Sequence, residues 1–285
     1  MSSDTVLVWM LSLNREYTKA EYHLVYNLCK TCFPETNYKY DASNADSFRV
    51  VMTQLLPVLM MRHRRVPRAK WQDHRTPAGK HWIELVPDGS GRPRNPLSIG
   101  YQLTFSNSLC GMAVTQGLPS QVVHIGLGIR QLKVEPRGVT LATFFESNAH
   151  KLTQLEITNI TAGGVGEDVV LKRLCINLAL KDAYVKALGQ PLGIDYSRLQ
   201  FDLPNRTAIC DGNPMIGWEF RLFGAKLGVA RGIMLKEEQY ECVCAYYRGN
   251  PATTFIFYPT PQELENWVQF INIDQLMAVA AKLAA

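Results

Sequence analysis

Two periodicities in the hydrophobic residues along the chain predict a mixed α+β protein. Short alternating or continuous apolar runs predict strands at 5–13, 82–86, 101–105, 111–115, 122–129, 198–203, 217–223, 234–243 and 255–258. Apolar residues recurring every three or four positions predict helices at 18–29, 43–56, 143–155 and 166–189, with a last helical tail capped by Asp274. The sequence shows no internal repeat.

Polar residues at the predicted helix starts support these assignments. Thr18 with Glu21 matches a capping box, and Ser43 and Thr143 are expected to cap the next two helices. Pro57 is expected to kink or end the second helix. The basic segment 62–80 is expected to be irregular, and the composition of residues 87–93 predicts a loop.

The helix at 166–189 carries the most informative charges. Acidic residues stand in its first turn, where the helix dipole favours them, and Gly189 supplies a C-terminal stop. Lys181, Asp182 and Lys186 interrupt its apolar run. Asp182 and Lys186 are four positions apart and therefore share a face. The charges belong to a functional site or, alternatively, form a solvated pair on a core helix.

Composition limits the function classes. The chain has 285 residues, 47% of them apolar, and a net charge of +5, which suits one large or two medium globular domains. Basic residues crowd into segment 62–75, which is either a surface for phosphates or acidic proteins or a solvated linker. No aromatic–basic module or zinc-ligand spacing indicates a nucleic-acid partner.

The seven cysteines are irregularly spaced, and the CxxC at 29–32 has no second pair. This pattern predicts reduced, buried thiols. The first residues do not resemble a signal peptide, and no apolar run approaches the roughly 20 residues that span a bilayer. We therefore expect a cytoplasmic protein without a membrane partner.

Five motifs in sequence resemble those of the 4′-phosphopantetheinyl transferases of the stand-alone, two-lobed kind. Residues 181–189, KDAYVKALG, are similar to that family's W-x-x-K-E-[AS]-x-x-K helix. The other four motifs cover most of the chain in the family's order: RTPAGK at 75–80, YQLTFS at 101–106, GLGI at 126–129 and GWEFRLF, common in the fungal branch, at 217–223.

The resemblance implies an α+β fold of two pseudo-twofold-related α+β lobes with a cleft between them. The expected N-terminal lobe is 1–122 and the expected C-terminal lobe is 123–285. Members of the two-lobed kind work as monomers, which is the expectation here. Their reaction moves phosphopantetheine from coenzyme A to a carrier-protein serine, with Mg²⁺ neutralising the pyrophosphate and carboxylates holding the metal.

The acidic positions depart from the family pattern. The strand Asp of the family aligns with Gly128, the second acid of bacterial members with Arg130, and a helix acid with Ala149. Asp182 is the one acid left at the aligned metal positions, although a shifted alignment would let Glu135 substitute. An inward-pointing Arg130 would oppose Mg²⁺ by about 8 kcal/mol at ~4 Å, whereas an outward-pointing one would not. We therefore expect no metal and no coenzyme A, with Mg²⁺ and coenzyme A as the alternative.

The nucleotide contacts change as well. The family His that contacts a coenzyme A phosphate aligns with Phe105, and the helix Trp aligns with Leu178. Both changes are expected to make the cleft more apolar. The expected substrate-binding residues there are Phe105, Leu178, Lys186, Lys80 and Tyr184.

These departures lead to three hypotheses. The first is a repurposed catalyst that cyclises, dehydrates or isomerises a small polyketide-type intermediate of fungal secondary metabolism. Its candidate catalytic groups are Asp182, Lys181, Arg130 and His124, although His124 is alternatively a structural histidine. The second is an active transferase with an altered metal site. The third is a non-catalytic module that binds an acyl or peptidyl carrier protein.

Overall fold

The computed structural model of the chain describes residues 6–86, 98–118, 122–189 and 194–283. The predicted loop at 87–93 lies outside them. Unit 1, one of two compact units, comprises Met1–Val123, Leu227–Glu237 and Leu264–Ala285, and unit 2 comprises His124–Lys226 and Glu238–Glu263. The first boundary lies one residue from the expected one, but two later segments group with unit 1. The two-lobe symmetry stays a prediction.

Unit 1 is built on a sheet of six strands in the order β13-β1-β5-β4-β3-β2. β1 runs antiparallel to β5 and parallel to β13. The first and last strands of the chain are therefore neighbours, and β13 forms one edge of the sheet. The strands are β1 (Leu7–Ser12), β2 (Trp71–Arg75), β3 (His81–Leu85), β4 (Ser98–Ser106), β5 (Leu109–Gly117) and β13 (Val268–Asn272).

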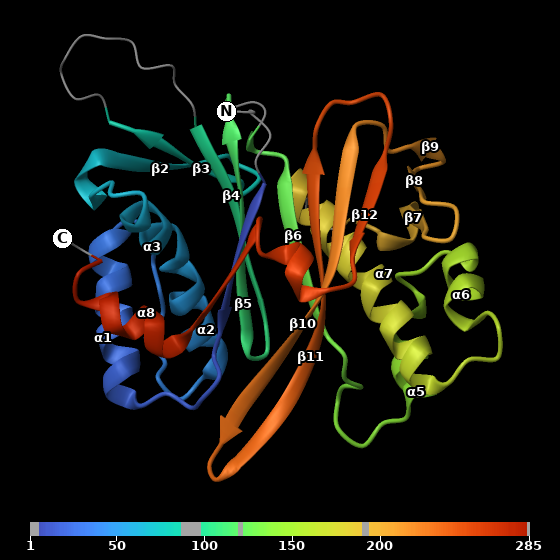
Figure 1. Cartoon of the computed structure of the whole chain (residues 1–285), viewed down its shortest axis with the longest axis horizontal. Coiled ribbons are helices and arrows are strands. Elements are labelled where there is room, and N and C mark those ends of the chain that lie inside the picture. The colour runs from blue at the N-terminus through green and yellow to red at the C-terminus, as the bar shows by residue number, and fades with distance from the viewer. Residues whose placement is uncertain (1–5, 87–97, 119–121, 190–193, 284–285) are drawn as a thin grey trace. The chain divides into compact units, whose positions relative to one another are not determined.

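Four helices cover one face of this sheet (Figure 1). They are α1 (Lys19–Cys32), α2 (Ala45–Gln54), α3 (Leu56–His63) and α8 (Ile273–Ala280). Their apolar faces and the sheet enclose a core that includes the fully buried Leu55, Met61 and Tyr101. The Thr18–Glu21 capping box forms as predicted, and Pro57 stands in the first turn of α3, where its missing N–H costs nothing.

Unit 2 contains a four-stranded sheet in the order β12-β10-β11-β6 and a small sheet of β7, β8 and β9. The strands are β6 (Ile125–Gln131), β7 (Leu199–Asp202), β8 (Thr207–Cys210), β9 (Asn213–Pro214), β10 (Trp218–Arg231), β11 (Met234–Tyr247) and β12 (Thr254–Tyr258). β11 pairs antiparallel with β6, and β10 pairs parallel with β12.

The helices of unit 2 are α5 (Leu141–Ala149), α6 (Gln154–Thr161) and α7 (Glu167–Leu188). Short 3₁₀ turns follow at η2 (Tyr196–Arg198) and, in the part of the chain that joins the units, at η3 (Pro261–Leu264). α7 lies against the sheet along β6 (Figure 1). It ends at Gly189, whose φ of 98° is the left-handed conformation that favours glycine, as predicted.

The mixed α+β class and most predicted elements are confirmed, and several boundaries are corrected. The basic segment 62–80 is not irregular throughout, because it contains the end of α3, the 3₁₀ turn η1 (Arg68–Lys70) and β2. The single helix predicted at 143–155 is two helices, α5 and α6. The N-caps are Asn44, Thr140 and Asn272 in place of Ser43, Thr143 and Asp274.

Within the described ranges, no helix is long and apolar enough to cross a membrane. All seven cysteines are free thiols, and six of them are buried. The prediction that all seven are buried is therefore wrong for Cys210, which is partly exposed.

Candidate active site

β6 and α7 approach each other so closely that only glycine fits on the facing strand positions. A Cβ added at Gly126 would lie 2.0 Å from the carbonyl oxygen of Ala183, and one at Gly128 would lie 2.1 Å from that of Ala179. Real Cβ atoms essentially never come within 3.0 Å. Ala179, Ala183 and Ala187 repeat every four residues on the helix face that meets these glycines. An acidic side chain at position 128 therefore has no room while α7 keeps this place.

Arg130 and Asp182 form an ion pair across the same interface. The Nη2 atom of Arg130 lies 2.5 Å from Oδ2 of Asp182, and the carboxylate side chain is 14% exposed. The phenol of Tyr196 donates a hydrogen bond to the other carboxylate oxygen at 3.2 Å. Arg130 therefore points toward α7, and both oxygens of Asp182 already have partners.

Two lysines make the surroundings of this pair strongly cationic. Burial lowers the pKa of Lys186, and the charge of Arg130 lowers it further, while Asp182 opposes both effects. Burial and Arg130 also lower the pKa of Lys151, at the turn after α5. Burial and the neighbouring carboxylate raise the pKa of Tyr196 to about 12. The cluster of Arg130, Lys151, Asp182, Lys186 and Tyr196 is hereafter the polar cluster.

The side chain of Lys181 points into the interior of unit 2 and meets the polar cluster at the backbone carbonyl of Tyr196. Its side chain is fully buried, and Nζ lies 2.8 Å from Oε2 of Glu156, whose side chain is also fully buried. The same ammonium donates to the carbonyl oxygens of Tyr196, at 2.8 Å, and Leu199. Burial lowers the pKa of Lys181, and Glu156 opposes that shift. This environment favours a structural role over the predicted catalytic one.

Three further predicted residues of unit 2 lie in apolar surroundings. Leu178 is buried in a small core beneath α5 and α6. Tyr184 packs edge-on against Trp218, with ring centroids 4.8 Å apart, and burial raises its pKa to about 12. His124 contacts Trp218 and Tyr247 edge-on, and its buried Nδ1 has no hydrogen-bond partner in the described part of the chain. The structure does not join these side chains to the polar cluster.

The predicted residues Lys80 and Phe105 belong to unit 1. Lys80 is only 3% exposed and donates to Oε1 of Gln102 at 3.0 Å. Phe105 stands on β4 opposite Cys110 and packs against the core of unit 1. Phe105 has no hydrogen-bonding group for a phosphate, so this position does not reproduce the phosphate contact of the family His.

The residues present do not fit a magnesium ion. Mg²⁺ needs several oxygen ligands in octahedral geometry, and no group of three His, Cys, Asp or Glu in the described ranges is placed to hold a metal. Position 128 has no room for a carboxylate, and the carboxylate of Asp182 is already paired with Arg130. A shifted alignment would supply Glu135 as a metal ligand. Its Oε1 lies 2.8 Å from Nζ of Lys133, and its side chain is about half exposed.

Sequence reasoning missed Tyr196, Lys151 and Glu156. The sequence did carry a sign of Glu156, because the spacing of Thr153 and Glu156 matches the capping box that they form at the start of α6. Tyr196 and Lys151 lie in a 3₁₀ turn and a helix–helix turn, where no periodicity marks them. Their proximity to Asp182 depends on tertiary folding.

Comparison with known proteins adds a relationship by descent. No family model matches the chain. Over 183 residues the chain is 32% identical to a protein of Paxillus involutus named 4′-phosphopantetheinyl transferase pptA. The match covers 62% of this chain and 66% of that relative, just under two thirds of its length. This homology supports a relationship between the chain and the 4′-phosphopantetheinyl transferase-like superfamily.

Proposed function

We propose that this chain keeps the transferase scaffold but has lost the magnesium-dependent transfer of phosphopantetheine from coenzyme A to a carrier-protein serine. The observation that carries the proposal is the 2.5 Å ion pair between Arg130 and Asp182. The guanidinium holds one carboxylate oxygen and Tyr196 holds the other. The close approach of α7 to Gly128 supports the same conclusion, because it leaves no space for a second acid.

Electrostatics adds to this steric argument. At an effective dielectric constant of about 20, a guanidinium ~4 Å from a divalent cation opposes it by about 8 kcal/mol. Lys151 and Lys186 add positive charge on the same side. Metal binding would therefore require both the loss of the ion pair and the displacement of three cations.

The polar cluster supports a different chemistry on a small carbonyl compound. Burial and the charge of Arg130 lower the pKa values of Lys186 and Lys151, and a lower pKa increases the fraction of a lysine amine that can act as a general base. A neutral lysine amine would take a proton from the carbon beside the carbonyl, and the C–H electron pair would move onto the carbonyl oxygen. Arg130, whose Nε has no partner among the described residues, would stabilise the resulting enolate. Tyr196 stays protonated and can donate a proton.

Such an enolate would lead to cyclisation, dehydration or isomerisation of a polyketide-type intermediate, and we propose a role in fungal secondary metabolism on that basis. Hydrogen–deuterium exchange beside the carbonyl of 1-tetralone, followed by NMR, tests the enolisation step. Exchange should be faster with the native chain than in buffer and should fall to the buffer rate in R130Q and K186M. The matched control K172Q, on the exposed side of α7, should leave exchange unchanged. Equal exchange in the native chain and buffer would reject this chemistry.

An active transferase is the second candidate, favoured by the printed name of the relative from Paxillus involutus. Intact-mass spectrometry of an apo-carrier protein incubated with the chain, coenzyme A and Mg²⁺ separates the two candidates. We expect no added phosphopantetheine, while a competent transferase loads the same carrier in parallel. Loading by this chain would overturn the proposed loss.

Binding of a carrier protein without turnover is the third candidate. The exposed Arg62 and Arg65 in the basic segment favour an acidic partner. Such binding would weaken steeply between low and physiological salt, because exposed charges are screened beyond about 8–10 Å. Apo-carrier binding that does not change with salt would contradict this candidate.

A further inference from the structure

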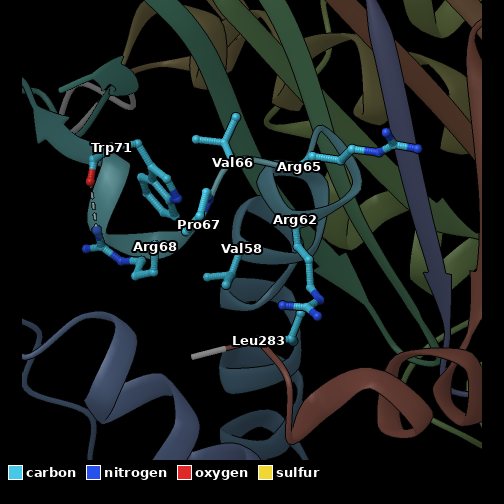
Figure 2. A pocket seen from close by; sticks show the side chains of 8 residues that line it. All are labelled: Val58, Arg62, Arg65, Val66, Pro67, Arg68, Trp71 and Leu283. Atoms are coloured by element: carbon cyan, nitrogen blue, oxygen red, sulfur yellow. Dashed lines mark hydrogen bonds between the residues drawn. The ribbon is translucent and has the colours of Figure 1, made fainter. Parts of the chain in front are cut away.

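A pocket lies in unit 1, between α3, η1 and the turn at the end of α8 (Figure 2). It encloses about 280 Å³ and shares no residue with the polar cluster. Its lining combines apolar side chains with three arginines: Val58, Arg62, Arg65, Val66, Pro67, Arg68, Trp71 and Leu283.

The walls of this pocket are apolar and firmly held. Val58, Trp71 and Leu283 are each no more than 2% exposed, so the core of unit 1 fixes their positions. Arg68 lies over the Trp71 ring at 4.1 Å and donates to the Cys32 and Trp71 carbonyl oxygens. The volume is just below the range of about 300–1,000 Å³ typical of ligand pockets, so a compact molecule fits it.

The lining carries positive charge, and none of its eight residues is acidic. In the ranges that the structure describes, no carboxylate forms an ion pair with Arg62, Arg65 or Arg68. Figure 2 shows Arg62 directed toward Leu283, whereas Arg65 extends away from Trp71. Arg62 donates one hydrogen bond to the carbonyl oxygen of Lys282, which leaves its other N–H groups for a ligand.

The indole of Trp71 supplies a second, independent sign of a missing acceptor. Trp71 is 1% exposed, and its Nε1–H has no hydrogen-bond partner among the residues that the structure describes. A buried donor without an acceptor destabilises the folded state, and buried donors in native proteins nearly always have a partner. An oxygen of a bound ligand would satisfy this N–H.

We propose that this pocket binds a small amphipathic carboxylate. The hydrocarbon part packs against Val58, Val66 and Leu283. One carboxylate oxygen accepts the Trp71 Nε1–H, and the carboxylate pairs with the guanidinium of Arg62. The site is independent of the polar cluster and of the chemistry proposed for it.

Titration of the ¹⁵N-labelled chain with 3-phenylpropanoate tests the proposal directly. The five tryptophans give five indole N–H signals, and W71F identifies the signal of Trp71 by its loss. We expect a saturable shift of that signal, and at least about tenfold weaker binding of the isosteric alcohol 3-phenylpropan-1-ol. A shift confined to other indoles, no saturation, or equal affinity for the alcohol would overturn the proposal.

Two charge-matched variants separate a direct contact from a general effect of positive charge. R62Q and K70Q each remove one positive charge from the same segment, but Lys70 does not line the pocket. R62Q should weaken 3-phenylpropanoate binding about tenfold or more, whereas K70Q should change it less than twofold. Equal weakening of 3-phenylpropanoate binding in R62Q and K70Q would indicate nonspecific attraction by positive charge and would reject the proposed site. If R62Q fails to fold, the ratio of acid to alcohol affinity on the native chain still decides.

Discussion

Lys181 and Glu156 form an ion pair in which neither side chain is exposed to solvent, with 2.8 Å between Nζ and Oε2. The same ammonium reaches the carbonyl oxygens of Tyr196 and Leu199, and the second oxygen of Glu156 accepts the backbone N–H of Phe201 at 2.9 Å. The pair therefore joins α7 to α6, η2 and β7. A residue that resembles a catalytic lysine in sequence is a central cross-link in the fold.

Removing this lysine should unfold unit 2 more easily. K181M leaves the Glu156 carboxylate buried without its counter-charge, which costs about 3–5 kcal/mol for a broken buried pair. The double variant K181M/E156Q should recover part of that loss, because the amide can still accept the Phe201 N–H. Urea unfolding of the three proteins measures both effects. A loss below about 1 kcal/mol in K181M would contradict the structural role.

A second prediction tests the close approach of β6 and α7. G128A places a methyl group 2.1 Å from the Ala179 carbonyl oxygen, so α7 or β6 must move. Overpacking of this kind costs about 1–3 kcal/mol. G224A is the matched control, since the nearest atom to its new Cβ is 3.8 Å away. Denaturant midpoints should fall in G128A and stay near the native value in G224A. Equal midpoints would mean that the helix is not confined there.

The sequence predicts α7 well, because its signals are local. The acidic first turn and the apolar period lie within the helix, Gly189 directly follows it, and the structure agrees with each of them. The absence of an acid at position 128 was also readable. What the sequence could not supply was the steric reason, since only tertiary packing places the Ala179 carbonyl against that strand position.

The site residues contributed by other segments were beyond local reasoning. Tyr196 is 14 residues from Asp182 along the chain and reaches it through the fold. β13 has too little alternation to stand out, and its pairing with β1 joins opposite ends of the chain. Arg130 was recognised as a candidate catalytic residue, but the direction of its side chain depends on where α7 packs. Periodic hydrophobic patterns predict helices and strands, whereas the contact partners of a side chain depend on residues far away in the sequence.

The Arg130–Asp182 pair predicts a change of metal affinity on charge reversal. R130E replaces the cation with a second carboxylate next to Asp182, which gives Mg²⁺ two hard oxygen ligands. Without metal, the two like charges should lower the melting temperature of the variant. Millimolar Mg²⁺ should then raise it, while the native chain shows no such rise.

R130Q serves as the control for R130E, because it removes the ion pair without adding an acid. It should lose stability and show no recovery with Mg²⁺. Differential scanning fluorimetry with MgCl₂, against NaCl at equal ionic strength, separates binding from screening. A native chain that Mg²⁺ stabilises as strongly as R130E would contradict the exclusion of the metal.

Thiol reactivity should single out Cys210. It is the one cysteine of the seven that is not buried. Burial and Asp211 raise its thiol pKa, so labelling should be slow at neutral pH and faster at higher pH, as the thiolate fraction increases. Ellman's reagent should modify about one thiol per folded chain, and C210S should abolish that phase. Rapid labelling of several thiols in C210S would show that the core opens readily.

The pKa of Lys186 offers the most direct measure of the polar cluster. Burial places it below the ordinary value of 10.5, with Arg130 lowering it and Asp182 raising it. R130Q should therefore raise the Lys186 pKa and D182N should lower it, as followed by ¹³C NMR of reductively methylated lysines, with K186R identifying the signal. Because the folded chain binds this proton more weakly than the unfolded chain, stability should rise with pH between the folded pKa and 10.5. K186M should flatten that rise, and an unchanged slope would place Lys186 outside the cluster.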